Sequence, residues 1–217
     1  MVAQNGILLQ FYLDPEKIAQ TYDPSWNPSA ATGKRWGVSR SRREKLLNLY
    51  LWFDDSLWMP MRLRLDGTDL FHCGGGPHRR IEAVHGPGAP RFEQGHDLCP
   101  WDRLPVIVAA KVGWFALRNA LHEGESGFMM ADQGAIVFRV QGQLVEVSFR
   151  AWYESPENYS LDAIQAVVDY DELFTKWELF SEQVRTQFLE VLPELAENVQ
   201  YGDWFRGGLD YLRRQPR

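Results

Sequence analysis

The side chains with the richest chemistry in this chain gather in one short stretch. Four of its five histidines and both of its cysteines lie from His72 to Cys99. Cys73 and His78 form one pair with four residues between them, and His96 and Cys99 form a second pair with two residues between them. Short loops that carry such pairs let Cys and His side chains reach one tetrahedral ion, and zinc is the metal that suits these ligands. The quartet is therefore a candidate zinc site.

A catalytic version of this site would keep one coordination position for water. His72 or His85 would then serve as the third protein ligand, and Asp97 would orient a ligand through a hydrogen bond. The chain would in that case be a metal-assisted hydrolase. The plainer interpretation is a polar loop whose histidines are exposed or bond to backbone carbonyls, and under that interpretation no cofactor binds.

No other catalytic pattern accompanies the loop. The sequence contains neither a phosphate-binding G-x-x-x-x-G-K-[ST] segment nor a G-x-S-x-G nucleophile turn, and it has no H-E-x-x-H pair. Adjacent acids such as Asp54 and Asp55 are typical of turns and helix starts, where carboxylates cap backbone N–H groups. We therefore expect a binding protein in preference to an enzyme.

Charge is divided unevenly along the chain, whose formal net charge is −6. Residues 1–111 hold 14 Lys and Arg against 12 Asp and Glu, whereas residues 112–217 hold 9 against 17. A surface of that sign repels nucleic acid and anionic membranes and attracts a basic protein. The alternative is a solvated helix face without a partner.

The first two thirds of the chain predict hairpins. Alternating apolar and polar residues indicate strands at 47–53 and 59–65, and Asp66-Gly67 favours a tight turn into a third strand. A further strand is expected at 7–13, before a short helix capped by Asp14. The run 105–112 reads as a buried strand, and 114–121 as strand or helix. The clearest hairpin joins 135–140 to 144–149 around Gln141-Gly142-Gln143, with Val145, Val147 and Phe149 on one face against Ile136, Phe138 and Val140 of the partner strand.

The last third predicts helices. Ser160 would cap a short helix through residue 168, and 201–212 would form another. Asp169 and Glu172 have the spacing of a capping box at the start of a longer helix, which Pro193 ends. Its apolar residues follow in steps of three and four. The acids off this stripe would face water or a partner, and together with Trp152 they are the predicted partner-binding residues: Glu172, Glu178, Glu182 and Glu190.

These elements predict an α+β protein forming a single domain over residues 1–217. An antiparallel, hairpin-built sheet of about six to eight strands would occupy most of 1–153, interrupted by a long loop at 73–104. The acidic, helical residues 154–217 would pack on that sheet. The length suits one such domain.

The sequence predicts neither an export signal nor a membrane span. Residues 1–10 lack a basic segment followed by a long apolar one, and the longest apolar runs are too short to cross a bilayer. Two cysteines without an export signal predict reduced thiols in the cytoplasm.

In size, charge and class the chain resembles the small acidic α+β immunity proteins of bacterial toxin systems. That likeness implies a protein that neutralises a basic, toxin-like partner by covering its active surface. The acidic surface would steer the partner, and some of the nine tryptophans would anchor it. The metal-assisted hydrolase is the alternative.

Overall fold

The computed structural model describes residues 6–16, 18, 47, 57, 59–70, 102–129, 134–151 and 164–216. The strands of this part form two four-stranded sheets. Sheet A contains β1 (Ile7–Phe11), β2 (Met59–Leu65), β3 (Thr68–Asp69) and β4 (Asp102–Leu104). Sheet B contains β5 (Glu125–Met129), β6 (Gly134–Gln141), β7 (Leu144–Ala151) and β8 (Ile164–Asp169). The helices are α5 (Val106–Glu123), α6 (Tyr170–Val191), the short 3-10 helix η3 (Pro193–Glu197) and α7 (Gly202–Arg214).

Sheet A is built around β2. β1 pairs along one edge of β2, while β3 and β4 pair with it on the other side, all antiparallel. The predicted turn at Asp66-Gly67 is confirmed, and both residues have positive φ (45° and 87°), the conformation that an Asp-Gly hairpin turn requires. The predicted loop 73–104 is wrong at its end, since β4 pairs Leu104 with Met59.

Sheet B is a meander in the order β5-β6-β7-β8. The predicted hairpin is confirmed, and so is the face that its apolar residues share. The structure adds the register: Ile136 lies opposite Phe149, Phe138 opposite Val147 and Val140 opposite Val145. Ile136, Phe138, Val145 and Val147 are fully buried. Alternation along the strands therefore leaves the opposite face of the sheet toward solvent.

Three segments differ from the predicted elements. The run 105–112 is not a strand but the start of α5, which also settles 114–121 as helix. Continuous burial of Val106 to Ala110 produces an apolar run that fits a buried strand and a buried helix equally. The predicted helix before Asp169 is wrong over 164–168, where β8 pairs with β7. Leu47, predicted in a strand, is helical.

The long acidic helix is confirmed as α6. Asp169 caps it by accepting a hydrogen bond from the Glu172 amide at 2.9 Å, and the helix ends at Val191, before Pro193. The predicted stripe is buried at Leu173, Trp177, Phe180, Val184 and Phe188. The last predicted helix is α7, although Gly208 interrupts it with φ 52° and ψ −141°.

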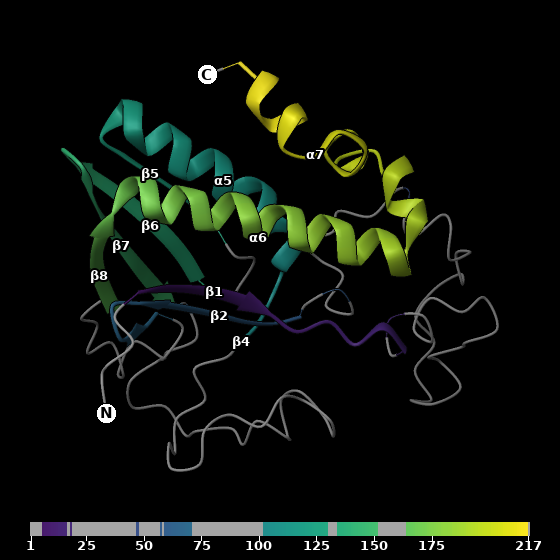
Figure 1. Cartoon of the computed structure of the whole chain (residues 1–217), viewed down its shortest axis with the longest axis horizontal. Coiled ribbons are helices and arrows are strands. Elements are labelled where there is room, and N and C mark those ends of the chain that lie inside the picture. The colour runs from purple at the N-terminus through teal and green to yellow at the C-terminus, as the bar shows by residue number, and fades with distance from the viewer. Residues whose placement is uncertain are drawn as a thin grey trace, which may run out of the picture.

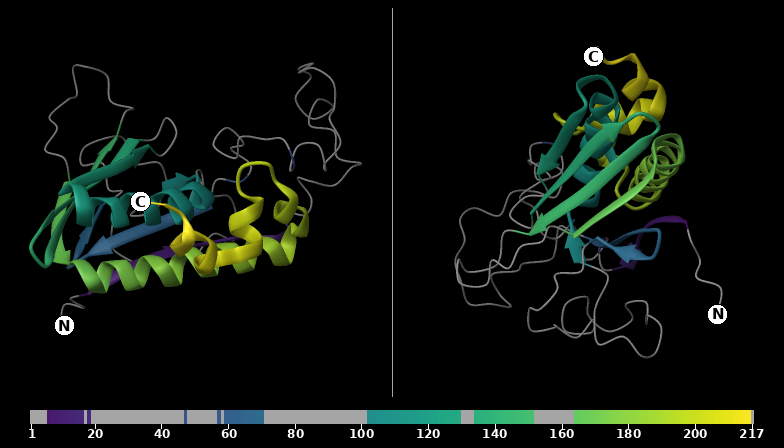
Figure 2. Two further views of the ribbon diagram at one scale, coloured as in Figure 1. Left: turned by 90° about the horizontal axis from the view of Figure 1, so that it is seen from above. Right: turned by 90° about the vertical axis from the view of Figure 1, so that its left-hand side faces the viewer.

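The helices and sheets share one hydrophobic core. α5 and α6 run side by side across the sheets, with sheet B at one end, β1 and β2 beneath α6, and α7 against the far part of the helix pair (Figures 1 and 2). Phe11 of β1 packs edge-on against Phe180 of α6 at 5.8 Å. Trp177 packs edge-on against Phe128 and Phe138 of sheet B. The fold class is therefore α+β with antiparallel sheets, as expected, but the strands form two sheets under the helices instead of one.

Among the described helices, none combines the length and the apolar character needed to cross a lipid bilayer.

Candidate functional site

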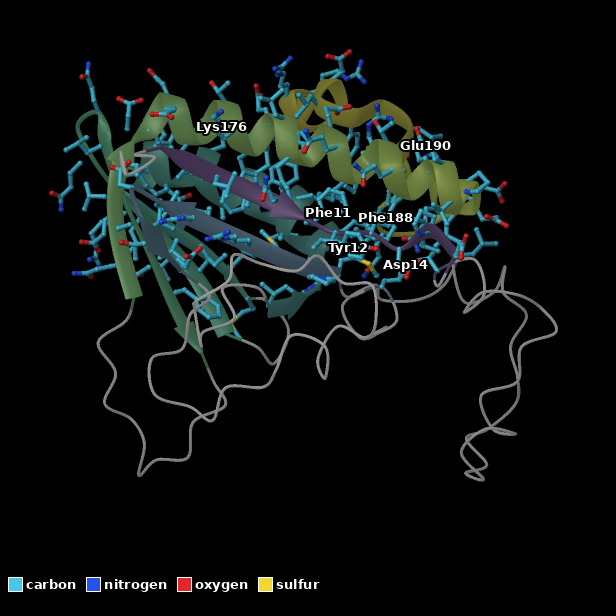
Figure 3. All side chains as sticks on the ribbon, turned by 60° about the horizontal axis from the view of Figure 1, so that its bottom comes forward. Phe11, Tyr12, Asp14, Lys176, Phe188 and Glu190 are labelled. Atoms are coloured by element: carbon cyan, nitrogen blue, oxygen red, sulfur yellow. The ribbon has the colours of Figure 1, made fainter. Side chains whose placement is uncertain are left out.

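The four predicted partner-binding acids of α6 occupy two different environments. Glu172 in the first turn and Glu190 in the last are exposed, and Figure 3 shows Glu190 and Lys176 projecting outward from the helix. The side chains of Glu178 and Glu182 are only 19% and 31% exposed. Both lie where α7 packs on α6.

Glu178 binds the end of α7. Its two carboxylate oxygens accept hydrogen bonds from Arg213 Nη2 at 3.0 and 3.1 Å. The indole N–H of the buried Trp114 points to the same carboxylate at 3.5 Å. Charge-assisted bonds of this kind are stronger than neutral ones, so Glu178 connects α5, α6 and α7.

Glu182 and Arg185 stabilise the interruption in α7. Because Gly208 leaves the helical conformation, nearby backbone groups lose their partners inside the helix. Glu182 Oε1 accepts a hydrogen bond from the Leu209 amide at 2.8 Å. Arg185 donates to the Phe205 carbonyl at 3.1 Å and is itself paired with Glu182 at 2.8 Å. The pair thus caps both halves of α7.

Two cations of α5 complete the attachment of α7. Lys111 Nζ donates to the Gln200 carbonyl at 2.8 Å and lies over the Tyr201 ring at 4.5 Å. Burial lowers the pKa of Lys111, and the charge of Asp203 opposes that shift. Arg118 donates to the carbonyls of Leu212, Gln215 and Pro216, where the negative end of the helix dipole favours a cation.

The predicted zinc ligands Cys73, His78, His96 and Cys99 lie outside the described residues, and so do His72, His85, Asp97 and Trp152. Within the described part, no three His, Cys, Asp or Glu side chains are grouped so that they could hold a metal ion. The zinc site stays a prediction.

The outer face of sheet B presents a different set of residues to solvent. One row crosses all four strands, from Glu125 through Arg139 and Glu146 to Val167. Arg139 pairs with Glu125 at 2.8 Å and with Glu146 at 2.9 Å. Hydrogen bonding to Glu125 and the charges of both carboxylates raise the pKa of Arg139. The one guanidinium in this row is therefore already engaged by two carboxylates.

Apolar side chains lie beside this charged row. Val167 is 51% exposed, and Leu144, in the neighbouring row opposite Asp169, is 50% exposed. Met129 on the edge strand β5 is 45% exposed. Exposed apolar side chains that stand alone are ordinary on protein surfaces, whereas several on one face are typical of a surface that a partner covers.

Carboxylates gather where this face meets the ends of the helices. β5 begins there directly after α5, and β8 passes directly into α6 (left end of the molecule in Figure 1). We call this region the acidic end of sheet B, and it comprises Leu144, Val167, Arg139 and six carboxylates: Glu123, Glu125, Glu146, Asp169, Asp171 and Glu172. All six are at least partly exposed.

Sequence reasoning found only Glu172 among these residues as a partner-binding candidate. The polar positions Glu146 and Ser148 were visible as the outer side of the predicted hairpin, and they were the available signal. The rest depended on β8. With 164–168 assigned to a helix, Val167 and Asp169 could not be placed beside Glu146 and Leu144.

No protein-family model matches the chain, and neither the curated proteins nor the solved structures contain a match to it.

Proposed function

We propose that the protein is a small binding protein of the immunity or antitoxin type that neutralises a basic protein partner in the cytoplasm. The observation that carries the proposal is the distribution of charge on the described surface. Residues 164–216 hold ten Asp and Glu against five Lys and Arg. Three of those five bases, Arg185, Arg206 and Arg213, pair with acids of the same segment.

The mechanism would begin with electrostatic steering. A surface with an excess of one sign raises the association rate of an oppositely charged protein, and the effect falls as salt screens the charges. Contact would then remove water from a central apolar patch, which supplies most of the affinity in typical interfaces. The partner's active surface would be covered instead of chemically altered.

Within the described residues, the exposed apolar side chains of this surface are not tryptophans. The described tryptophans, Trp114, Trp177 and Trp204, are all buried in the core. The large exposed apolar side chains of the described part are aliphatic: Leu121, Met129, Leu144, Val167, Leu179 and Val199. Trp152 remains a proposed anchor from outside the described residues.

A co-expression experiment tests the proposal. Each reading frame that flanks this gene is induced in a heterologous bacterial host, with and without this chain. We expect one flanking product to be basic and toxic, and its toxicity to be relieved by this chain through a complex whose association rate falls steeply with salt. The proposal would be contradicted if this chain relieved the toxicity of none of the flanking products. It would also be contradicted if the association rate did not change with salt.

A further inference from the structure

We propose that the acidic end of sheet B is the docking surface for a basic protein, with Leu144 and Val167 at its centre. This inference rests on the proposed function and assigns the surface that performs it. The sequence placed partner-binding residues in the middle of α6, where Glu178 and Glu182 in fact bind α7. The surface proposed here is the outer face of the neighbouring sheet instead.

The surface is held in place before any partner arrives. The inner faces of the same strands bury Phe128 and Phe138, and both rings pack edge-on against Trp177. The hairpin of β6 and β7 pairs over its full length, from Gln141 and Leu144 at the turn to Gly134 and Ala151. A rigid platform loses little conformational entropy on binding, so its exposed apolar side chains contribute more fully to affinity.

The arrangement of apolar and charged groups is that of an interface. Leu144 and Val167 project from neighbouring strands on the same face, since Leu144 lies opposite Asp169 and Glu146 opposite Val167. Glu146 lies opposite Val167 and Asp169 opposite Leu144, and Asp171 and Glu172 follow Asp169 in the first turn of α6. Interfaces typically combine an apolar centre with a polar rim that stays partly hydrated.

Charge complementarity indicates which kind of partner fits the acidic end of sheet B. Arg139 is the one base among the residues that define this surface, and Glu125 and Glu146 already bind it. A second copy of the chain would set carboxylates against carboxylates on this face, and like charges brought together across an interface oppose binding. A partner whose surface carries Lys and Arg around an apolar patch fits instead.

A selection with random peptides tests the assignment without knowledge of the partner. A phage-displayed library of random peptides is selected on the immobilised wild-type chain, and an enriched peptide is synthesised for affinity measurements. The test variant is the double substitution Leu144→Arg and Val167→Arg. The matched control is Leu179→Arg, which changes a side chain of 56% exposure on α6. Circular dichroism and thermal unfolding check the fold of each variant.

We expect the enriched peptides to combine Lys or Arg with large apolar residues. Their affinity should fall by about tenfold or more for the Leu144→Arg and Val167→Arg variant and change by less than about twofold for Leu179→Arg. Basic peptides that bind the double variant as tightly as wild type would overturn this surface and leave the proposed function standing. A selection without any excess of Lys and Arg would overturn both.

A second variant keeps the test decisive if the double arginine variant does not fold. Asp171→Asn and Glu172→Gln remove two exposed charges at the start of α6 with little change of shape. The enriched peptide should bind this variant about threefold more weakly at low salt and equally well at high salt, because screening removes the electrostatic component. Equal affinity at both salt concentrations would contradict the assignment.

Discussion

Carboxylates serve two opposite purposes in two regions of this molecule. Between α6 and α7, Glu178 and Glu182 face arginines and a backbone amide, and each is engaged by strong hydrogen bonds. At the acidic end of sheet B, the single Arg139 faces several exposed carboxylates. Residue type is the same in both regions. What differs is the group on the opposite side, so one region stabilises the fold and the other presents charge to solvent.

The largest loss of stability among these predictions is expected when Glu182 is removed. Glu182→Ala leaves the Leu209 amide and the Arg185 guanidinium without their carboxylate. We expect the free energy of unfolding to fall by about 2–3 kcal/mol, as for other broken networks of partly buried charges. The matched control Glu190→Ala, on the exposed side of the same helix, should change it by less than about 0.5 kcal/mol. Urea unfolding measures both, and similar losses would show that α7 is not capped as described.

A backbone change at the interruption of α7 should have a similar or smaller effect on the free energy of unfolding. Gly208 has φ 52°, and a Cβ atom there would lie 2.5 Å from Glu182 Oε1 and 3.0 Å from Arg185 Nε. Gly208→Ala should therefore cost about 1–3 kcal/mol through backbone strain and displacement of the pair. In the Glu182→Ala background part of that cost should disappear, since the closest atom is gone. Additive losses in a double-mutant cycle would contradict the proposed contact.

The stability of the protein should fall at alkaline pH because of Tyr170, the first residue of α6. Tyr170 donates its hydroxyl hydrogen bond to the Leu117 carbonyl at 3.2 Å. Burial, aided by the charge of Asp171, raises the pKa of Tyr170 from 10.0 to about 12. Because the folded pKa exceeds the unfolded one, the folded state retains its proton longer. The stabilisation from Tyr170 is then fully present below pH 10.0 and is lost as the pH rises toward about 12.

Thermal unfolding of wild type and Tyr170→Phe at a series of pH values checks this. The variant lacks the ionisable hydroxyl, so its melting temperature should fall less steeply than that of wild type above pH 10.0. Parallel curves would exclude Tyr170 as the source of the alkaline loss.

The smallest effect on stability is expected at the docking surface itself. Arg139 and its two carboxylates are solvent-exposed, with side-chain exposures of 48%, 53% and 29%. Exposed ion pairs of this kind contribute little to stability, because solvent and salt screen them, so Glu125→Gln should barely change the urea midpoint. Chemical denaturation at two salt concentrations measures it. A loss as large as that of Glu182→Ala would show that the row stabilises the fold and would remove the contrast between the two regions.

Sequence patterns predicted the elements whose signals are local. The β6–β7 hairpin, the face that its apolar residues share and the Asp66-Gly67 turn follow from alternation and turn chemistry over a few residues. The cap and buried stripe of α6 follow in the same way from spacing. Elements buried on more than one side were predicted less well, because the start of α5 shows an unbroken apolar run that carries no period.

The sequence by itself determined the class of the fold, the excess of negative charge in the second half of the chain and the carboxylates that α6 carries off its apolar stripe. The tertiary structure decided which of those carboxylates remain at the surface. It placed α7 over Glu178 and Glu182, and it placed β8 beside β7, so that Val167 and Asp169 join Glu146 and Leu144 on one face. The physical reason is that a charge acts through its neighbours in space, and neighbours from separate elements are fixed by packing instead of by spacing along the chain.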